Sequence, residues 1–179
     1  LLFMYILLLY TQRYHDYSLP GGGIDEGEDE VAGLMRELQE ETGARGIRNI
    51  KPFARYDEYR PWYKNDADII HMISHCYVCE IDDELGDTAF ESHEISNGMK
   101  PVWMNIHQAI AHNEDIIANS DKKGLSIDRE TFLLKVIAEE IDGRLVNVKD
   151  LKNVKDLKDE TIHTDNYDLI GFGSGVYRE

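Results

Sequence analysis

The chain contains 179 residues, of which 42% are hydrophobic and 30% are charged. This is the composition of an ordinary globular domain, and it excludes wholesale disorder and fibrous repeats. Thirty-five acidic residues against nineteen lysines and arginines leave a formal net charge of -16, which excludes a broad basic surface for duplex nucleic acid. A small phosphorylated ligand is compatible with this charge, because a metal ion can mediate between acidic side chains and an anion.

The cysteine content and the first residues indicate a cytoplasmic protein without membrane contact. Two cysteines are too few for a disulfide scaffold and indicate a reducing compartment. Residues 1–10 form an apolar run that is too short to span a bilayer as a helix, and it lacks the basic flank and cleavage site of a signal peptide. We therefore predict that this run is a buried β-strand.

Strands and helices are expected to alternate along the chain. After the first strand, Pro20 and the three glycines behind it predict a loop. An apolar stripe predicts a helix that begins near Asp29 and is ended by Gly43. Further strands are predicted at residues 47–56, 69–81 and 101–104, further helices at 106–111 and 127–141, and loops at 59–66 and 82–98. This order indicates an α/β fold with a mixed β-sheet between helices.

The predicted helix after the glycine loop carries an unusual concentration of acidic residues. At about 100° per residue, the carboxylates of Glu37, Glu40 and Glu41 fall within an arc of about 100°. Like charges on one helical face repel each other, and a hard cation such as Mg²⁺ or Mn²⁺ would reverse that penalty. Gly33 leaves open space on the same face, and the preceding glycines allow the backbone to approach a phosphate.

The spacing of these residues resembles the signature of the Nudix hydrolases, the MutT-like family. Gly22 is followed after five residues by Glu28, and after seven more by the run RELQEETGA from Arg36 to Ala44. Pro20 and Gly21 also resemble the start of that motif. The resemblance implies a Nudix-type α/β/α sandwich and hydrolysis, with Mg²⁺ or Mn²⁺, of a nucleoside diphosphate linked to another moiety.

The resemblance also implies a role for each of the charged residues. By that similarity Glu37, Glu40 and Glu41 bind metal, Glu28 is an additional or supporting metal residue, and Arg36 holds a carboxylate in place. Glu37, Arg36 and Glu41 are thus the expected catalytic residues. A carboxylate near the attacking water can act as general base. Glu37 is one candidate, and Glu91 and Glu94 in the acidic segment downstream are two others.

The substrate is less clearly marked than the reaction. Gly22 and Gly23 are expected to bind it through their backbone, and Arg60, Trp62 and Tyr63 offer a positive charge and flat rings for phosphate contact and base stacking. The same side chains can equally pack their loop onto the domain. An ADP-ribose-like or nucleotide-sugar-like small molecule is the favoured substrate, and a nucleoside triphosphate is the alternative. A non-catalytic nucleotide sensor would be expected to lose some of the three glutamates.

We expect residues 1–145 to form the Nudix domain and residues 146–179 to form a charged, glycine-containing tail. The tail repeats the six residues NVKDLK, and its glycine-rich end is predicted to be a flexible terminus. Cys76 and Cys79 lie in one predicted strand at an odd separation, which predicts that they face opposite sides of the sheet. A homodimer is compatible with the sequence, although no pattern in it determines the oligomeric state.

Overall fold

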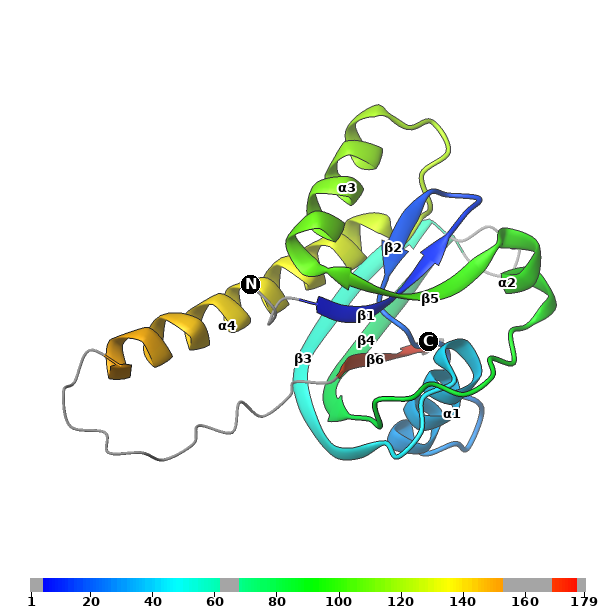
Figure 1. Ribbon diagram of the computed structural model, residues 1–179. Helices are drawn as coiled ribbons and strands as arrows, with labels where there is room; N and C mark the ends of the chain where they lie inside the picture. The colour runs from blue at the N-terminus through cyan, green and yellow to red at the C-terminus, as the bar shows by residue number, and fades with distance from the viewer. Residues whose placement is uncertain (1–4, 62–67, 153–168, 177–179) are drawn as a thin grey trace.

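The computed structural model describes residues 5–61, 68–152 and 169–176. The elements follow in the order β1 (Tyr5–Thr11), β2 (Asp16–Ser18), α1 (Glu30–Thr42), β3 (Arg48–Pro61), β4 (Ile69–Glu80), α2 (Ser92–Asn97), β5 (Met99–Asn105), α3 (Ile106–Asn119), α4 (Ile127–Lys152) and β6 (Leu169–Val176) (Figure 1). The strands form two three-stranded sheets, in the orders β2-β1-β5 and β3-β4-β6. All pairings between these described strands are antiparallel.

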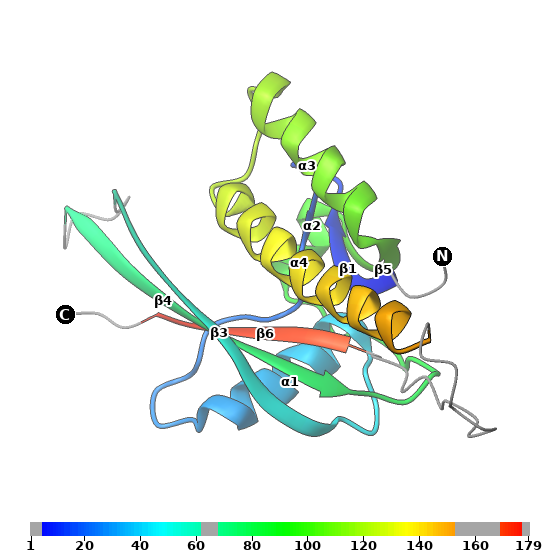
Figure 2. The same ribbon diagram turned by 90° about the vertical axis from the view of Figure 1, so that its left-hand side faces the viewer.

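The strands lie between helices, which confirms the expected α/β/α sandwich. Figure 2 shows α1 on one side of the β3-β4-β6 sheet and α3 and α4 on the other. Strand β1 is buried on both faces: Ile6 and Leu8 belong to the hydrophobic cluster that includes α4, whereas Leu7 belongs to the cluster that includes α1. Successive side chains of a strand point to opposite faces, so the apolar run at the start of the chain supplies both halves of the core.

The two cysteines of β4 show the same alternation. Cys76 packs in the cluster with α4, and Cys79 packs in the cluster with α1. Both thiols are buried, and neither forms a disulfide. The prediction that they face opposite sides of the sheet is therefore confirmed, and they act as apolar core residues.

Helix α1 begins and ends where its flanking residues indicate. The side chain of Asp29 accepts hydrogen bonds from the amides of Val31 and Ala32 at the N-terminus. Gly43 ends the helix at φ 70°, a left-handed conformation that glycine adopts without strain. A β-carbon on Gly43 would also lie 2.1 Å from the carbonyl oxygen of Gly86, so the loop after β4 packs directly against this end of the helix.

Two short elements lie where no strand or helix is predicted. Strand β2 pairs with β1 and leads the chain back toward the glycine loop. Helix α2 lies within the acidic segment, where the amide of Glu91 donates to the Glu94 carboxylate over 2.7 Å and Gly98 ends the helix at φ 68°. The Glu91-to-Glu94 spacing is the signal that predicts such a helix start, since a side chain three residues into a helix can reach back to its cap.

Strand β3 is longer than predicted. Strand β3 continues to Pro61 and pairs with β4, so Tyr59 and Arg60 lie in a strand instead of a loop. Pro61 is tolerated there because β3 is the edge of its sheet.

The tail differs from its predicted form as well. Helix α4 runs to Lys152, across the boundary predicted between residues 145 and 146. Strand β6 pairs antiparallel with β4 where a flexible terminus is predicted, and it satisfies backbone groups along the β4 edge. No helix in the described ranges combines the length and the apolar character needed to cross a membrane.

Candidate active site

Arg36 lies at the centre of the acidic residues of α1 and its preceding loop. Its guanidinium donates to both carboxylate oxygens of Glu28, from Nε over 2.9 Å and from Nη2 over 3.0 Å. Its Nη1 donates to Glu37 over 2.8 Å and to Glu40 over 3.4 Å. The structure thus brings three of the predicted metal residues together around one positive charge.

The glycine loop packs directly against two of the glutamates. The amide of Gly21 donates to Glu41 Oε2 over 2.7 Å. A β-carbon on Gly22 would lie 2.4 Å from the carboxylate of Glu37, so only glycine allows this approach. The carbonyl oxygen of Gly23 accepts a hydrogen bond from Arg36. Gly21 was not among the residues selected from the sequence, although the Pro-Gly pair that precedes the signature marks its position.

Gly33 provides space on the same helical face, as predicted. A β-carbon there would lie 2.9 Å from Glu28 Oε2, which shows that the Glu28 carboxylate fills the space. The paired guanidinium of Arg36 and the amide of Asp25 hold the pKa of Glu28 at about 2. Glu28 is therefore ionised at all physiological pH values.

Glu41 and Glu94 form a buried pair of carboxyl groups. Glu41 is 4% exposed and Glu94 is 8% exposed. Burial raises the pKa of Glu41 to about 9; the Gly21 amide opposes this, whereas the charges of Glu94 and Glu37 and a hydrogen bond with Glu94 add to it. Burial likewise raises the pKa of Glu37, against the opposing effect of Arg36. Helix α2 thus places Glu94 beside the α1 glutamates. A downstream acid that acts as general base would need to lie there.

The donor set fits a divalent cation in its chemistry. Carboxylate oxygens are the ligands that Mg²⁺ and Mn²⁺ prefer, and a cation would replace the proton that burial places on Glu41. Within the described ranges, no three acidic, histidine or cysteine side chains are gathered closely enough to hold an ion as they stand. Arg36 bridges Glu28, Glu37 and Glu40 instead, so binding of an ion by these glutamates would require their side chains to rearrange.

The other predicted residues lie in different surroundings. The side chain of Glu91 is 71% exposed and pairs with His93, which separates it from the buried glutamates. Arg60 lies near the end of β3, and its Nη1 is buried with no hydrogen-bond partner among the described residues. Trp62 and Tyr63 lie outside the described residues. The neighbouring Tyr59 is 72% exposed and stacks on His71 at a centroid distance of 4.3 Å.

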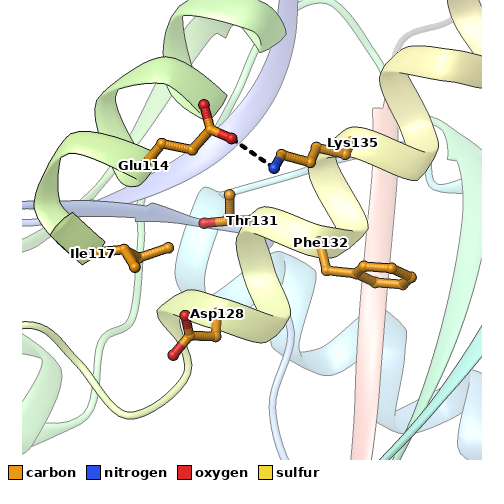
Figure 3. A pocket seen from close by; sticks show the side chains of 6 residues that line it. All are labelled: Glu114, Ile117, Asp128, Thr131, Phe132 and Lys135. Atoms are coloured by element: carbon orange, nitrogen blue, oxygen red, sulfur yellow. Dashed lines mark ion pairs between the residues drawn. The ribbon is translucent and has the colours of Figure 1, made fainter.

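A hollow between α3 and α4 lies apart from these residues. It is lined by Glu114, Ile117, Asp128, Thr131, Phe132 and Lys135 (Figure 3). Glu114 and Lys135 form an ion pair of 2.6 Å in it. The lining has two acids against one lysine, a smaller excess of negative charge than the four carboxylates around Arg36.

Comparison with known proteins gives matches that are concentrated in part of the chain. The RNA pyrophosphohydrolase of Bartonella quintana is 46% identical over 56 residues, which are 31% of this chain and 29% of that protein. The 8-oxo-(d)GTP phosphatase of Mycolicibacterium smegmatis is 40% identical over 42 residues, or 24% of this chain and 13% of that protein. A longer match, 28% identical over 108 residues, is to the CMP-5'-(N-acetyl-N-hydroxy-3-aminopropyl)phosphonate hydrolase of Streptomyces rubellomurinus.

The first two matches span less than a third of the length of each relative. The third match spans 58% of this chain and 47% of that relative. The family model described as the NUDIX domain matches residues 6–125. That range is more than half of the chain, and it contains β1, the glycine loop, α1 and α2. The chain belongs to the NUDIX family.

Proposed function

We propose that this protein is a metal-dependent pyrophosphohydrolase that cleaves a phosphorus anhydride in a nucleotide, with Mg²⁺ or Mn²⁺ as cofactor. The observation that carries the proposal is the packing of Gly21 and Gly22 against the carboxylates of Glu41 and Glu37. Glycines bring the loop backbone close to these carboxylates without a side chain in the way, and the carboxylates favour a divalent cation. Such a cation binds the phosphate oxygens of a diphosphate as well.

Glu37, Glu40 and Glu41 would hold the metal ion, with Glu28 in support. When bound, the ion would neutralise the charge of the phosphate oxygens and lower the pKa of bound water. Arg36 keeps Glu28, Glu37 and Glu40 on one side of the helix until the ion enters.

Two groups suit the role of general base. Glu37 and Glu94 both lie at the glutamate cluster. Burial raises the pKa of Glu37, which makes its carboxylate a better proton acceptor. Glu91 is less suited, because its side chain is largely exposed and pairs with His93.

We propose a small nucleoside-diphosphate derivative as the substrate, of the ADP-ribose or nucleotide-sugar type. The relative with the longest of the three matches carries a name in which CMP is joined to a phosphonate, which supports a nucleotide linked to another moiety. A nucleoside triphosphate is the second candidate, because the Mycolicibacterium relative is named for 8-oxo-(d)GTP. Arg60 would meet a phosphate in either case, and its buried Nη1, which has no partner in the described part of the chain, supports that role.

A substrate panel tests the proposal. ADP-ribose, a UDP-sugar, GTP, 8-oxo-dGTP and a 5'-triphosphorylated RNA oligonucleotide are each incubated with the full chain and Mg²⁺ or Mn²⁺, and the products are separated by ion-exchange chromatography. We expect a nucleoside monophosphate from the linked substrates, and no product once EDTA is added. Cleavage of only the triphosphates would show that the substrate is a triphosphate and not a linked nucleoside diphosphate. Tight nucleotide binding without any product would instead identify a nucleotide sensor.

A further inference from the structure

The glycine loop is anchored from both sides, by two glutamates of different helices. On the α1 side, Gly21 donates to Glu41 over 2.7 Å. On the α4 side, the amide of Leu19 donates to Glu130 Oε2 over 3.0 Å. Leu19 is 5% exposed and Glu130 is 7% exposed, so water does not compete for this second bond. Only Pro20 separates the two anchored residues.

The carboxylate of Glu130 is itself held in one orientation. Its other oxygen, Oε1, accepts from Arg129 Nε over 3.1 Å and from Arg129 Nη2 over 2.8 Å. Arg129 also donates from Nη1 to Glu58 of β3 over 2.8 Å. The side chain of Arg129 is only 10% exposed. With one oxygen bound to Arg129 and the other to Leu19, Glu130 has little freedom to rotate.

We propose that Glu130 is a positioning residue for the active site, which acts by holding Leu19 and thereby the glycine loop against Glu41 and Glu37. The proposal rests on the proposed function for its catalytic consequence. Gly22 lies directly against the Glu37 carboxylate. A small shift of the loop would therefore displace that carboxylate. Misplacement of reacting groups by about 1 Å can lower a rate about a hundredfold.

A structural role alone would predict something different. A buried ion pair adds little net stability compared with apolar side chains of the same size. Arg129 has a second carboxylate partner in Glu58, and the bond from Glu130 to Leu19 is a separate contact made with the other oxygen. The two contacts can therefore be broken one at a time, which separates loop positioning from the stability of the buried pair.

The test is backbone amide exchange, measured by NMR on the ¹⁵N-labelled full chain without metal. In Glu130→Gln, the single carbonyl oxygen turns to Arg129 and an NH₂ group faces the Leu19 amide, so the Leu19 bond is lost. We expect exchange of the Leu19 and Gly21 amides to rise about tenfold, as loss of a charge-assisted hydrogen bond implies. We also expect kcat to fall about ten- to a hundredfold with a smaller change in KM.

Glu58→Gln is the matched control. It disturbs the same buried Arg129 but leaves both bonds of Glu130 in place, so we expect the melting temperature to fall while Leu19 and Gly21 exchange at the wild-type rate and kcat is unchanged. If Glu130→Gln does not fold, Glu130→Asp keeps the charge beside Arg129 and withdraws the carboxylate from Leu19. Equal exchange in Glu130 and Glu58 variants, or wild-type exchange in the Glu130 variants, would overturn the proposal.

Failure of the proposed function gives a different result. If the wild-type chain cleaves no nucleotide in the panel, the proposed activity is wrong. A contrast in Leu19 and Gly21 exchange between the Glu130 and Glu58 variants would still support anchoring of the loop by Glu130. If instead the wild-type chain is active and Glu130→Gln keeps its kcat, the activity stands and the positioning role is refuted.

Discussion

Two arginines of this protein are each surrounded by carboxylates, and their surroundings differ in charge and in access to water. Arg36 lies within 4.0 Å of Asp25, Glu28, Glu37 and Glu40 and its side chain is 31% exposed. Arg129 is paired with Glu58 and Glu130 and its side chain is 10% exposed. The first cluster therefore has a large excess of negative charge that solvent ions can reach, and the second is nearly balanced and closed.

This difference explains why similar groups support different roles. Around Arg36 the excess carboxylates repel each other, so under the proposed function a divalent cation entering from solvent would gain binding energy from them. Around Arg129 the two carboxylates are already paired with one guanidinium and largely shielded from solvent, and they fix α4 to β3 and to the glycine loop. We therefore expect the first cluster to rearrange when a cation binds and the second to keep its structure.

The largest effect is expected from Glu41→Gln in the first cluster. Loss of one metal carboxylate should lower kcat by about a thousandfold. The fold should survive, because burial already favours the neutral form of Glu41 in the metal-free protein and Gln has nearly the same shape. Hydrolysis rate and circular dichroism are measured on the variant and on Glu139→Gln, an exposed glutamate of α4. Wild-type turnover by Glu41→Gln at saturating substrate would refute the assignment.

Replacing each arginine in turn tests the difference between the two clusters, because the two variants should lose different amounts of unfolding free energy. Arg129→Met leaves Glu58 and Glu130 buried without a cation, and we expect the free energy of unfolding to fall by about 3–5 kcal/mol. Arg36→Met should cost less, about 1 kcal/mol, because Arg36 and its partners Asp25 and Glu40 are exposed to water and ions. Added Mg²⁺ should restore stability to the Arg36 variant alone. Urea denaturation with and without Mg²⁺ measures both, and equal losses that Mg²⁺ does not change would contradict the contrast.

Local periodicity is the reason that the first cluster could be predicted. Residue spacing on one helix predicts that Glu37, Glu40 and Glu41 share a face, and Asp29 and Gly43 mark its ends, so α1 follows from neighbours in sequence. That Arg36 holds a carboxylate in place is implied by the Nudix resemblance and not by the spacing. The catalytic roles of these residues remain predictions. The order of most strands and helices could be predicted for the same reason, since each depends on its own stretch of chain.

Long-range contacts could not be predicted in this way. Glu130 binds the amide of Leu19 across 111 positions of sequence, and no spacing rule connects them. The proximity of Glu94 to Glu41 depends on how the loop after β4 packs on α1. Strand β6 is stabilised by pairing with β4, whereas its glycines indicate flexibility when they are considered alone. Tertiary packing determines each of these features.

A smaller effect is expected where the glycine loop meets the first cluster. Gly22→Ala places a methyl group within 2.4 Å of the Glu37 carboxylate, which must move. We expect Mn²⁺ affinity and kcat to fall by about ten- to a hundredfold. Gly23→Ala is the matched variant, because its methyl group would meet no atom within 4 Å, and it should keep wild-type Mn²⁺ affinity. Mn²⁺ titration followed by electron paramagnetic resonance compares them. Equal affinity of the two variants would show that Glu37 does not bind the ion in its present position.

The smallest effect is expected at Asp16, which lies beside the second cluster. Burial raises the pKa of Asp16 to about 6, the charge of Glu130 adds to this, and its own backbone amide and His112 oppose it. The folded state therefore holds this proton more tightly than the unfolded state, in which the carboxyl has a pKa near 4. The resulting stability is fully present below about pH 4 and is lost as pH rises through about 6.

Asp16→Asn removes this titration while keeping a neutral side chain of the same size. We expect the difference in unfolding free energy between the variant and the wild type to change with pH by roughly 2 kcal/mol in favour of the variant between pH 4 and 7. Urea denaturation at several pH values measures the difference, in which the titrations shared by both proteins cancel. A constant difference would show that the pKa of Asp16 is the same in the folded and unfolded states, and it would contradict the shift expected from burial and from the charge of Glu130.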